Sequence, residues 1–145
     1  MGTRIGGWGW VFLVIGVGTL ANAAWMLLDP GGWYTDLPAG VPDFGPLNVH
    51  FVRDIGCAFA TVGIALVWAA IAPRWRFPLV GVAMAFFSAH ALLHVWDTWR
   101  GAVDVHHLLL DLPGVYLPPL ILGFALRAMK RAEAADHLNP TGKGG

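Results

Sequence analysis

The sequence is poor in the charged residues that cover soluble proteins. Only 12% of its 145 residues are charged, against an average of roughly 25%, and nine Lys and Arg residues balance nine Asp and Glu residues. Hydrophobic residues make up 57% of the chain. This composition excludes a disordered chain and an ordinary cytosolic enzyme. Without a net positive charge, it also argues against a nucleic-acid partner.

Three residue types that occur only once exclude whole classes of chemistry. Cys57 is the only cysteine, which rules out an intrachain disulfide and a cysteine-based zinc site. Glu133 is the only glutamate and no HExxH motif occurs, so zincin-type proteolysis is excluded. Ser88 is the only serine, which argues against a serine nucleophile. P-loop and dinucleotide-binding fingerprints are also absent.

What the sequence does contain is four apolar stretches, each long enough to cross a bilayer as a helix of ~20 residues. They run over about 8–28, 48–72, 77–96 and 107–128. The predicted fold is therefore all-α, a four-helix transmembrane bundle over residues 1–132, followed by a flexible cytoplasmic tail over 133–145. Pro113, Pro118 and Pro119 fall in the fourth stretch and predict a kink there.

Basic residues predict how this bundle lies in the membrane. They gather before the first span, between the second and third, and after the fourth, at Arg4, Arg74, Arg76, Arg127, Lys130 and Arg131. The loop over 29–47 has no Lys or Arg, and the loop over 97–105 has only Arg100. The positive-inside rule then places both termini in the cytoplasm and the long loop between helices 1 and 2 outside. A signal peptide cleaved near Ala21-Asn22-Ala23 is the alternative, but the apolar run has spanning length.

Small residues recur at helical spacing on three of the spans. They are Gly16 and Gly18 in the first, Gly56, Ala60 and Gly63 in the second, and Gly81, Ala85 and Ala89 in the third. Such rows allow helix backbones to approach closely in lipid. They predict tight packing, either within one chain or between chains in a homo-oligomer or a larger membrane complex.

Ionisable side chains and one asparagine gather at the outer end of all four predicted spans. The members are Asn22, Asp29, His50, Arg53, Asp54, His90, His94, Asp97, Asp104, His106, His107 and Asp111. Several are four residues apart and so share a helix face, as His90 and His94 do. Ionisable groups within a membrane are costly and mark functional candidates.

The first interpretation of this cluster is a site for a divalent transition metal, zinc, copper or iron, used in redox or hydrolytic chemistry or in metal transfer. Imidazole and carboxylate groups suit these ions. The candidate ligands are His50, His90, His94, His107, Asp54 and Asp97. The residues expected to orient them or to form an ion network around them are Arg53, His106, Asp111 and Asn22.

Other interpretations stay open. One alternative is an electron-transfer protein that binds haem or a quinone. The candidate haem ligands are His50 with His94, or His90 with His107. A proton path is disfavoured because the inner half of the bundle offers no polar continuation. In a non-catalytic subunit of a larger complex, the cluster would be structural, and Asp111 would cap the fourth helix. The loop over 29–47, with four prolines, four glycines and three aromatic residues, is expected to be a lid or a partner surface.

One stretch also carries a family resemblance. Residues 48–56, where Arg53 and Gly56 follow an acidic, proline-rich outer loop, resemble the start of the second helix in small bacterial four-helix membrane proteins grouped as DoxX-like. The histidines of the third and fourth spans go beyond that pattern. The resemblance implies a four-helix bundle in a bacterial inner membrane, and it implies no reaction.

Overall fold

The computed structural model describes residues 5–138, which form helices joined by short turns and contain no strand. Four long helices make up most of this part: α1 (Gly7–Leu28), α3 (Val49–Ile71), α4 (Arg76–Trp99) and α6 (Leu117–Leu138). The shorter elements are α2 (Pro30–Asp36), η1 (Val41–Phe44), η2 (Pro73–Trp75), α5 (His107–Leu110) and η3 (Leu112–Tyr116). Four stretches are long and apolar enough to cross a membrane, so the predicted all-α chain with four apolar helices is confirmed.

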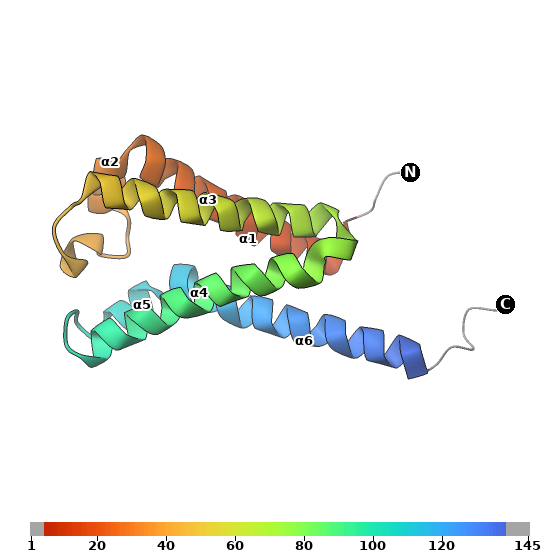
Figure 1. Cartoon of the computed structure of the whole chain (residues 1–145). Helices are drawn as coiled ribbons and strands as arrows, with labels where there is room; N and C mark the ends of the chain where they lie inside the picture. The colour runs from red at the N-terminus through yellow and green to blue at the C-terminus, as the bar shows by residue number, and fades with distance from the viewer. Residues whose placement is uncertain (1–4, 139–145) are drawn as a thin grey trace.

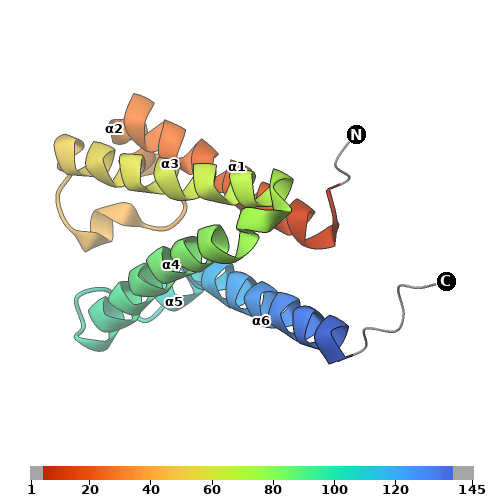
Figure 2. The ribbon, with the colours of Figure 1, turned by 45° about the vertical axis from the view of Figure 1, so that its right-hand side comes forward.

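The long helices form two pairs that diverge toward one end of the molecule (Figure 1). α1 packs along most of α3, and α4 packs against both α3 and α6. The start of α1 and the end of α6 lie at the end opposite to η1. Seen from another side, α2 and η1 lie at the open end of the molecule, where the two pairs are furthest apart (Figure 2).

Glycines set the close approach of α1 to α3. A Cβ atom added to Gly63 would lie 2.7 Å from the Leu20 side chain and 3.1 Å from the carbonyl oxygen of Gly16. A Cβ on Gly16 would in turn lie 3.0 Å from the backbone nitrogen of Val67. The predicted tight packing is therefore confirmed for this pair. At Gly81 on α4 it is not found among residues 5–138, because a Cβ there would meet nothing within 4 Å.

The turn between α3 and α4 is fastened by Arg76. Its guanidinium donates to the carbonyl oxygens of Ala69, at 2.9 Å, and Ala70, at 3.0 Å. These carbonyls belong to the last turn of α3, where intrahelical partners run out. The turn thus holds the two helix pairs together at the end opposite to η1.

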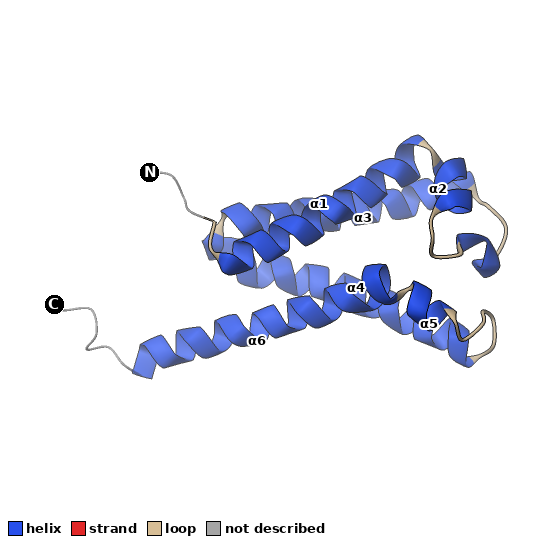
Figure 3. Ribbon diagram, turned by 180° about the vertical axis from the view of Figure 1, so that it is seen from behind, coloured by secondary structure: helices blue, strands red, loops and turns tan. Residues whose placement is uncertain are grey.

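The fourth apolar stretch is broken rather than continuous, as its prolines predict. α5 is followed by the π-helical turn η3, which contains Pro113, and only then does α6 begin (Figure 3). α6 continues to Leu138, past the domain boundary predicted at residue 132. The rest of the predicted tail, residues 139–145, lies outside the described residues.

Much of the surface of these helices is apolar. Large hydrophobic side chains that are more than half exposed include Trp10, Val14, Ile64, Leu92 and Phe124. Such a surface is unfavourable in water and suits the acyl chains of a bilayer. The interior contains a smaller set of well-packed residues, among them Phe12, Leu66 and Phe87.

Candidate functional site

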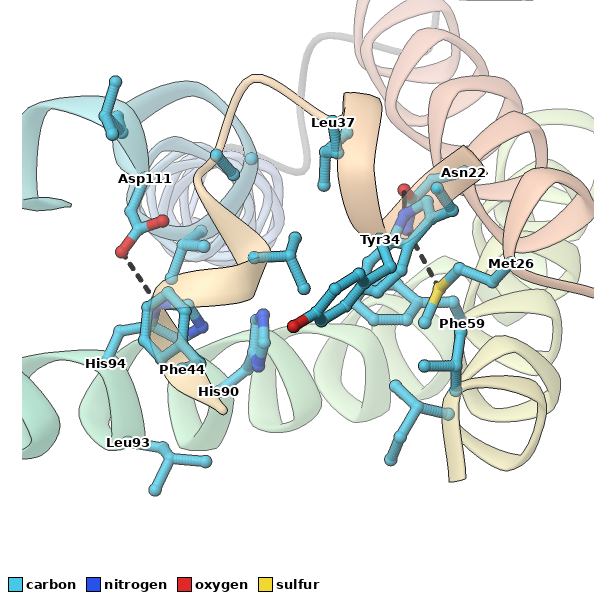
Figure 4. A pocket seen from close by; sticks show the side chains of 18 of the residues that line it. Asn22, Met26, Tyr34, Leu37, Phe44, Phe59, His90, Leu93, His94 and Asp111 are labelled. Carbon is cyan, nitrogen blue, oxygen red and sulfur yellow. Dashed lines mark hydrogen bonds and ion pairs between the residues drawn. The ribbon is translucent and has the colours of Figure 1, made fainter. Parts of the chain in front are cut away.

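A cavity of about 920 Å³ occupies the space between the two diverging helix pairs. Its walls come from α1, α3, α4 and the fourth span, and η1 and its neighbours line it from the open end. Apolar and aromatic side chains make up most of the lining. Polar groups enter it at a few positions, and the close view labels several of them: Asn22, Tyr34, His90, His94 and Asp111 (Figure 4).

Residues 29–47, here called the covering segment, line the open end of the cavity. Trp33 donates from its indole nitrogen to the Oδ1 atom of Asn22 on α1, at 2.9 Å. The hydroxyl of Tyr34 donates to the carbonyl oxygen of Gly45, at 2.8 Å, which closes the segment on itself. Trp33, Tyr34 and Phe44 all line the cavity. The covering segment therefore borders the cavity and is joined to α1 by the Trp33–Asn22 bond, and its role as a lid or a partner surface stays a prediction.

His94 and Asp111 form the most buried histidine–carboxylate pair of the site. The Nδ1 atom of His94 lies 2.7 Å from the Oδ2 atom of Asp111, and the Asp111 side chain is only 1% exposed. The other carboxylate oxygen, Oδ1, is buried without a partner among residues 5–138. Asp111 does stand at the N-cap position of η3, but its side chain makes no capping bond and faces α4 instead.

His90 lies one turn before His94 on α4 and faces the same cavity (Figure 4). Its ring meets His94 edge to face, with 4.6 Å between ring centroids, and lies edge-on to Phe59 at 5.6 Å. It also stacks on Phe86 at 6.2 Å. No group of residues 5–138 forms a hydrogen bond with its ring nitrogens. His90 therefore offers a free polar group in an aromatic part of the cavity.

His107 belongs to a separate place, outside the cavity lining. Its side chain is completely buried, and its Nε2 atom lies 3.0 Å from the Oδ2 atom of Asp43 in η1. The ring of Phe44 lies between the two sites, with its centroid 5.0 Å from those of both His94 and His107. Gly40 packs directly on His107, since an added Cβ would lie 2.9 Å from its Cε1 atom.

Asp43, His106 and His107 can each offer one ligand atom within 4.8 Å of the others. His106 is oriented by Asp104, whose Oδ1 atom lies 3.0 Å from Nδ1 of His106 and accepts from its backbone nitrogen at 2.9 Å. These bonds lower the pKa of the Asp104 carboxyl below its usual value, first through the backbone bond and then through the imidazole.

The other predicted ligands join neither the His94–Asp111 pair nor the group around His107. His50 and Asp54 pair with each other at 3.4 Å on the surface of α3, where their side chains are 89% and 60% exposed. Arg53 donates to the carbonyl oxygen of Leu27 at 3.2 Å and ties α3 to the end of α1. Asp97 lines the cavity but binds Arg100, at 2.8 Å. The six predicted metal ligands therefore do not converge on one point.

The sequence patterns do not single out Asp43, which lies beside His107, or Tyr34, which lines the cavity. Both come from the covering segment, whose path over the cavity depends on contacts with helices distant in sequence. The spacing of Asp43 from His107, 64 residues, carries no local signal. The proline-restrained, acidic character of the loop was the available indication.

Comparisons with family models, with curated proteins and with solved structures find no match to this chain. The resemblance to DoxX-like proteins is thus neither supported nor contradicted, and it stays a prediction. The function has to be argued from the cavity and the side chains that line it.

Proposed function

We propose that this protein is an integral membrane protein that binds a quinone in the cavity between its two helix pairs. The ring would lie among the aromatic side chains, its carbonyl oxygens would meet His90 and His94, and its apolar tail would extend between the helices into lipid. The single observation that carries the proposal is a large, mainly apolar cavity into which an unpartnered histidine and a buried His–Asp pair both point.

The size and lining of the cavity support this class of ligand. A volume of about 920 Å³ lies near the upper end of the ~300–1,000 Å³ typical of small-molecule sites, which combine apolar walls with a few placed polar groups. Phe44, Phe59 and Phe87 offer faces and edges for packing against a flat ring. A water-soluble ligand would leave most of these walls without a favourable partner.

The His94–Asp111 pair suits a carbonyl oxygen. Because Nδ1 of His94 is engaged by Asp111, Nε2 is the nitrogen left for a ligand. With both ring nitrogens protonated, His94 donates from Nε2 beside the carboxylate, and a neutral His94 that donates from Nδ1 to Asp111 accepts at Nε2. Hydrogen bonds of this charge-assisted kind are stronger than those between neutral groups. His90 adds a second, independent donor one helical turn away.

The alternatives predicted from the sequence fit the geometry less well. A metal held by His50, His90, His94, His107, Asp54 and Asp97 needs ligands that converge, and His50 and Asp54 are on the exposed side of α3. Haem between His50 and His94 meets the same obstacle. Haem between His90 and His107 is disfavoured because Phe44 separates His107 from the cavity. A non-catalytic subunit remains the competing proposal, in which the cavity binds no ligand.

We further place the cavity at the extracytoplasmic side of a bacterial inner membrane, with both termini in the cytoplasm. The basic residues Arg74 and Arg76 support this orientation, since they lie in the turn at the opposite end of the helices from the covering segment. The membrane itself is inferred from the resemblance of residues 48–56 to DoxX-like proteins.

A cavity-filling substitution tests the function. Gly18 lines the cavity, and a Cβ atom there would meet nothing within 4 Å, so Gly18→Leu places a side chain in the cavity without a clash at its Cβ. Gly81→Leu is the matched control, because Gly81 also has free space at its Cβ but does not line the cavity. Binding of a short-chain ubiquinone to the protein in lipid nanodiscs is measured by quenching of tryptophan fluorescence, with Trp33 as the reporter in the lining.

The wild type and Gly81→Leu are expected to bind the quinone alike, and Gly18→Leu to bind at least tenfold more weakly. His94→Gln is expected to weaken binding by about 1.5–3 kcal/mol, the value of a hydrogen bond to a charged group. Saturable binding by none of these proteins, or equal binding by all of them, would support the non-catalytic subunit instead.

A further inference from the structure

A second site lies beside the cavity, at the contact between the covering segment and α5. Asp43 comes from η1, and His106 and His107 come from the start of α5. Their ligand atoms all lie within 4.8 Å of one another. We infer that these three residues bind a divalent transition ion of the zinc class, and that this ion fastens the covering segment over the cavity.

The donor set and its spacing fit such an ion. Two imidazoles and one carboxylate are a common ligand set for zinc, and a fourth, open position is filled by water. Ligand atoms that each lie ~2.0–2.1 Å from a tetrahedral ion are roughly 3.3 Å apart. The Nε2 atom of His107 and the Oδ2 atom of Asp43 are already 3.0 Å apart. These two atoms are therefore close to the spacing of a bound ion, and the ligand atom of His106, within 4.8 Å, would complete the set by moving closer.

Two features prepare the histidines for this role. Asp104 engages Nδ1 of His106, which leaves Nε2 of that ring free to ligate. This carboxylate–histidine arrangement is the one that orients imidazoles in metal sites. His107 is completely buried, and Gly40, with a φ of 63°, packs on its ring and fixes its position. A left-handed backbone at Gly40 favours glycine, so η1 can approach this closely.

The ion would join parts of the chain that are far apart in sequence. Asp43 and His107 are separated by 64 residues and by two of the four apolar helices. Phe44 follows Asp43 directly and packs against both His94 and His107. Holding Asp43 in place therefore also holds Phe44 in the cavity wall. The metal would cross-link the covering segment to α5 and would not line the cavity itself.

Zinc titration of the full-length protein in nanodiscs tests the site, with Mg²⁺ as the control ion. Asp43→Asn and His106→Gln each remove a ligand, and both side chains are more than half exposed, so folding is expected to persist. Their matched controls are Asp36→Asn, an exposed aspartate of the same segment, and His50→Gln, an exposed histidine of α3. Asp104→Asn tests the orienting bond.

The wild type and both controls are expected to bind one Zn²⁺ with equal affinity and no Mg²⁺. Asp104→Asn should weaken binding by ~10–100-fold, and the two ligand variants by more. Zn²⁺ should also slow hydrogen exchange in residues 37–48 of the wild type but not of Asp43→Asn. The inference is overturned if the wild type binds no Zn²⁺, if the control variants weaken binding equally, or if exchange is unchanged. All of these experiments are done without quinone. A negative result would therefore overturn the metal site but not the proposal that the cavity binds a quinone.

Discussion

The imidazole of His94 lies 2.7 Å from the carboxylate of Asp111, across the contact between α4 and the fourth span. The two residues are 17 positions apart, and the π-helical turn η3 begins directly after Asp111. π-helical turns are rare and often occur at functional sites. Here the turn begins directly after Asp111, whose carboxylate faces α4. The irregular backbone and the contact with His94 therefore occur at the same point of the chain.

The strength of this pair can be measured with a double-mutant cycle. His94→Gln, Asp111→Asn and the double variant are expected to show a coupling energy of about 0.5–3 kcal/mol, as for contacting residues in one network. The pair is buried, so solvent screens it little. Unfolding by denaturing detergent, followed by circular dichroism, gives the free energies.

The pair His50–Asp54 provides the matched control for that cycle. It joins the same residue types at 3.4 Å, but both side chains are mostly exposed on α3. Exposed ion pairs contribute little, about 0–1 kcal/mol. Equal coupling energies in the two cycles would contradict the buried, functional character assigned to His94 and Asp111.

The close approach of α1 and α3 leads to a second prediction. Gly63→Ala introduces a Cβ atom 2.7 Å from the Leu20 side chain, so either the side chain or the helix must move. Overpacking of this kind costs about 1–3 kcal/mol. Gly81→Ala, where the Cβ meets nothing within 4 Å, is expected to leave stability unchanged or to raise it slightly. Thermal unfolding in detergent compares the two, and equal melting temperatures would contradict the role of Gly63.

The fold could be predicted from the sequence because each span carries its own signal. Length and hydropathy alone identify four apolar helices, and prolines such as Pro113 indicate the break in the last one. Spacing also placed His90 and His94 on one face of a helix. These features are local, so they need no knowledge of how the helices pack.

Which polar residues meet could not be predicted in the same way. At one end of a bundle every ionisable group is a candidate, and helix rotation decides which ones face the interior. His50 and Asp54 face outward on α3, whereas Asp111 turns toward His94. The partner of His107 is Asp43, which lies in the covering segment, 64 residues earlier in the sequence. Contacts of this kind depend on tertiary packing and leave no periodic pattern in the sequence.

A third prediction concerns the bond that fastens the covering segment to α1. Asn22→Ala removes the acceptor of the Trp33 indole and leaves that donor without a partner. The cost of such an unpaired group is about 1–3 kcal/mol. The variant is expected to exchange backbone hydrogens faster in α2 and η1 but not in α4, as measured by mass spectrometry. Trp33→Phe, which removes the donor instead, leaves an unpaired amide oxygen and should act in the same direction. Faster exchange throughout the chain would show general destabilisation and contradict a specific fastening role.

The last prediction tests the orientation on which the extracytoplasmic site depends. Cys57 is the only cysteine and is exposed, so Cys57→Ala gives a background without a reactive thiol. Two exposed turn positions at opposite ends of α4 then receive a cysteine, Ala102→Cys and Arg74→Cys. With both termini in the cytoplasm, a membrane-impermeant maleimide should label Ala102→Cys in intact bacterial cells with a permeable outer membrane. Arg74→Cys should be labelled only after the inner membrane is opened, which also shows that its thiol reacts. The reverse pattern would place the covering segment, the cavity and the inferred metal site on the cytoplasmic side. It would leave their internal geometry unchanged, because the contacts of His94, Asp111, Asp43 and His107 do not depend on which side they face.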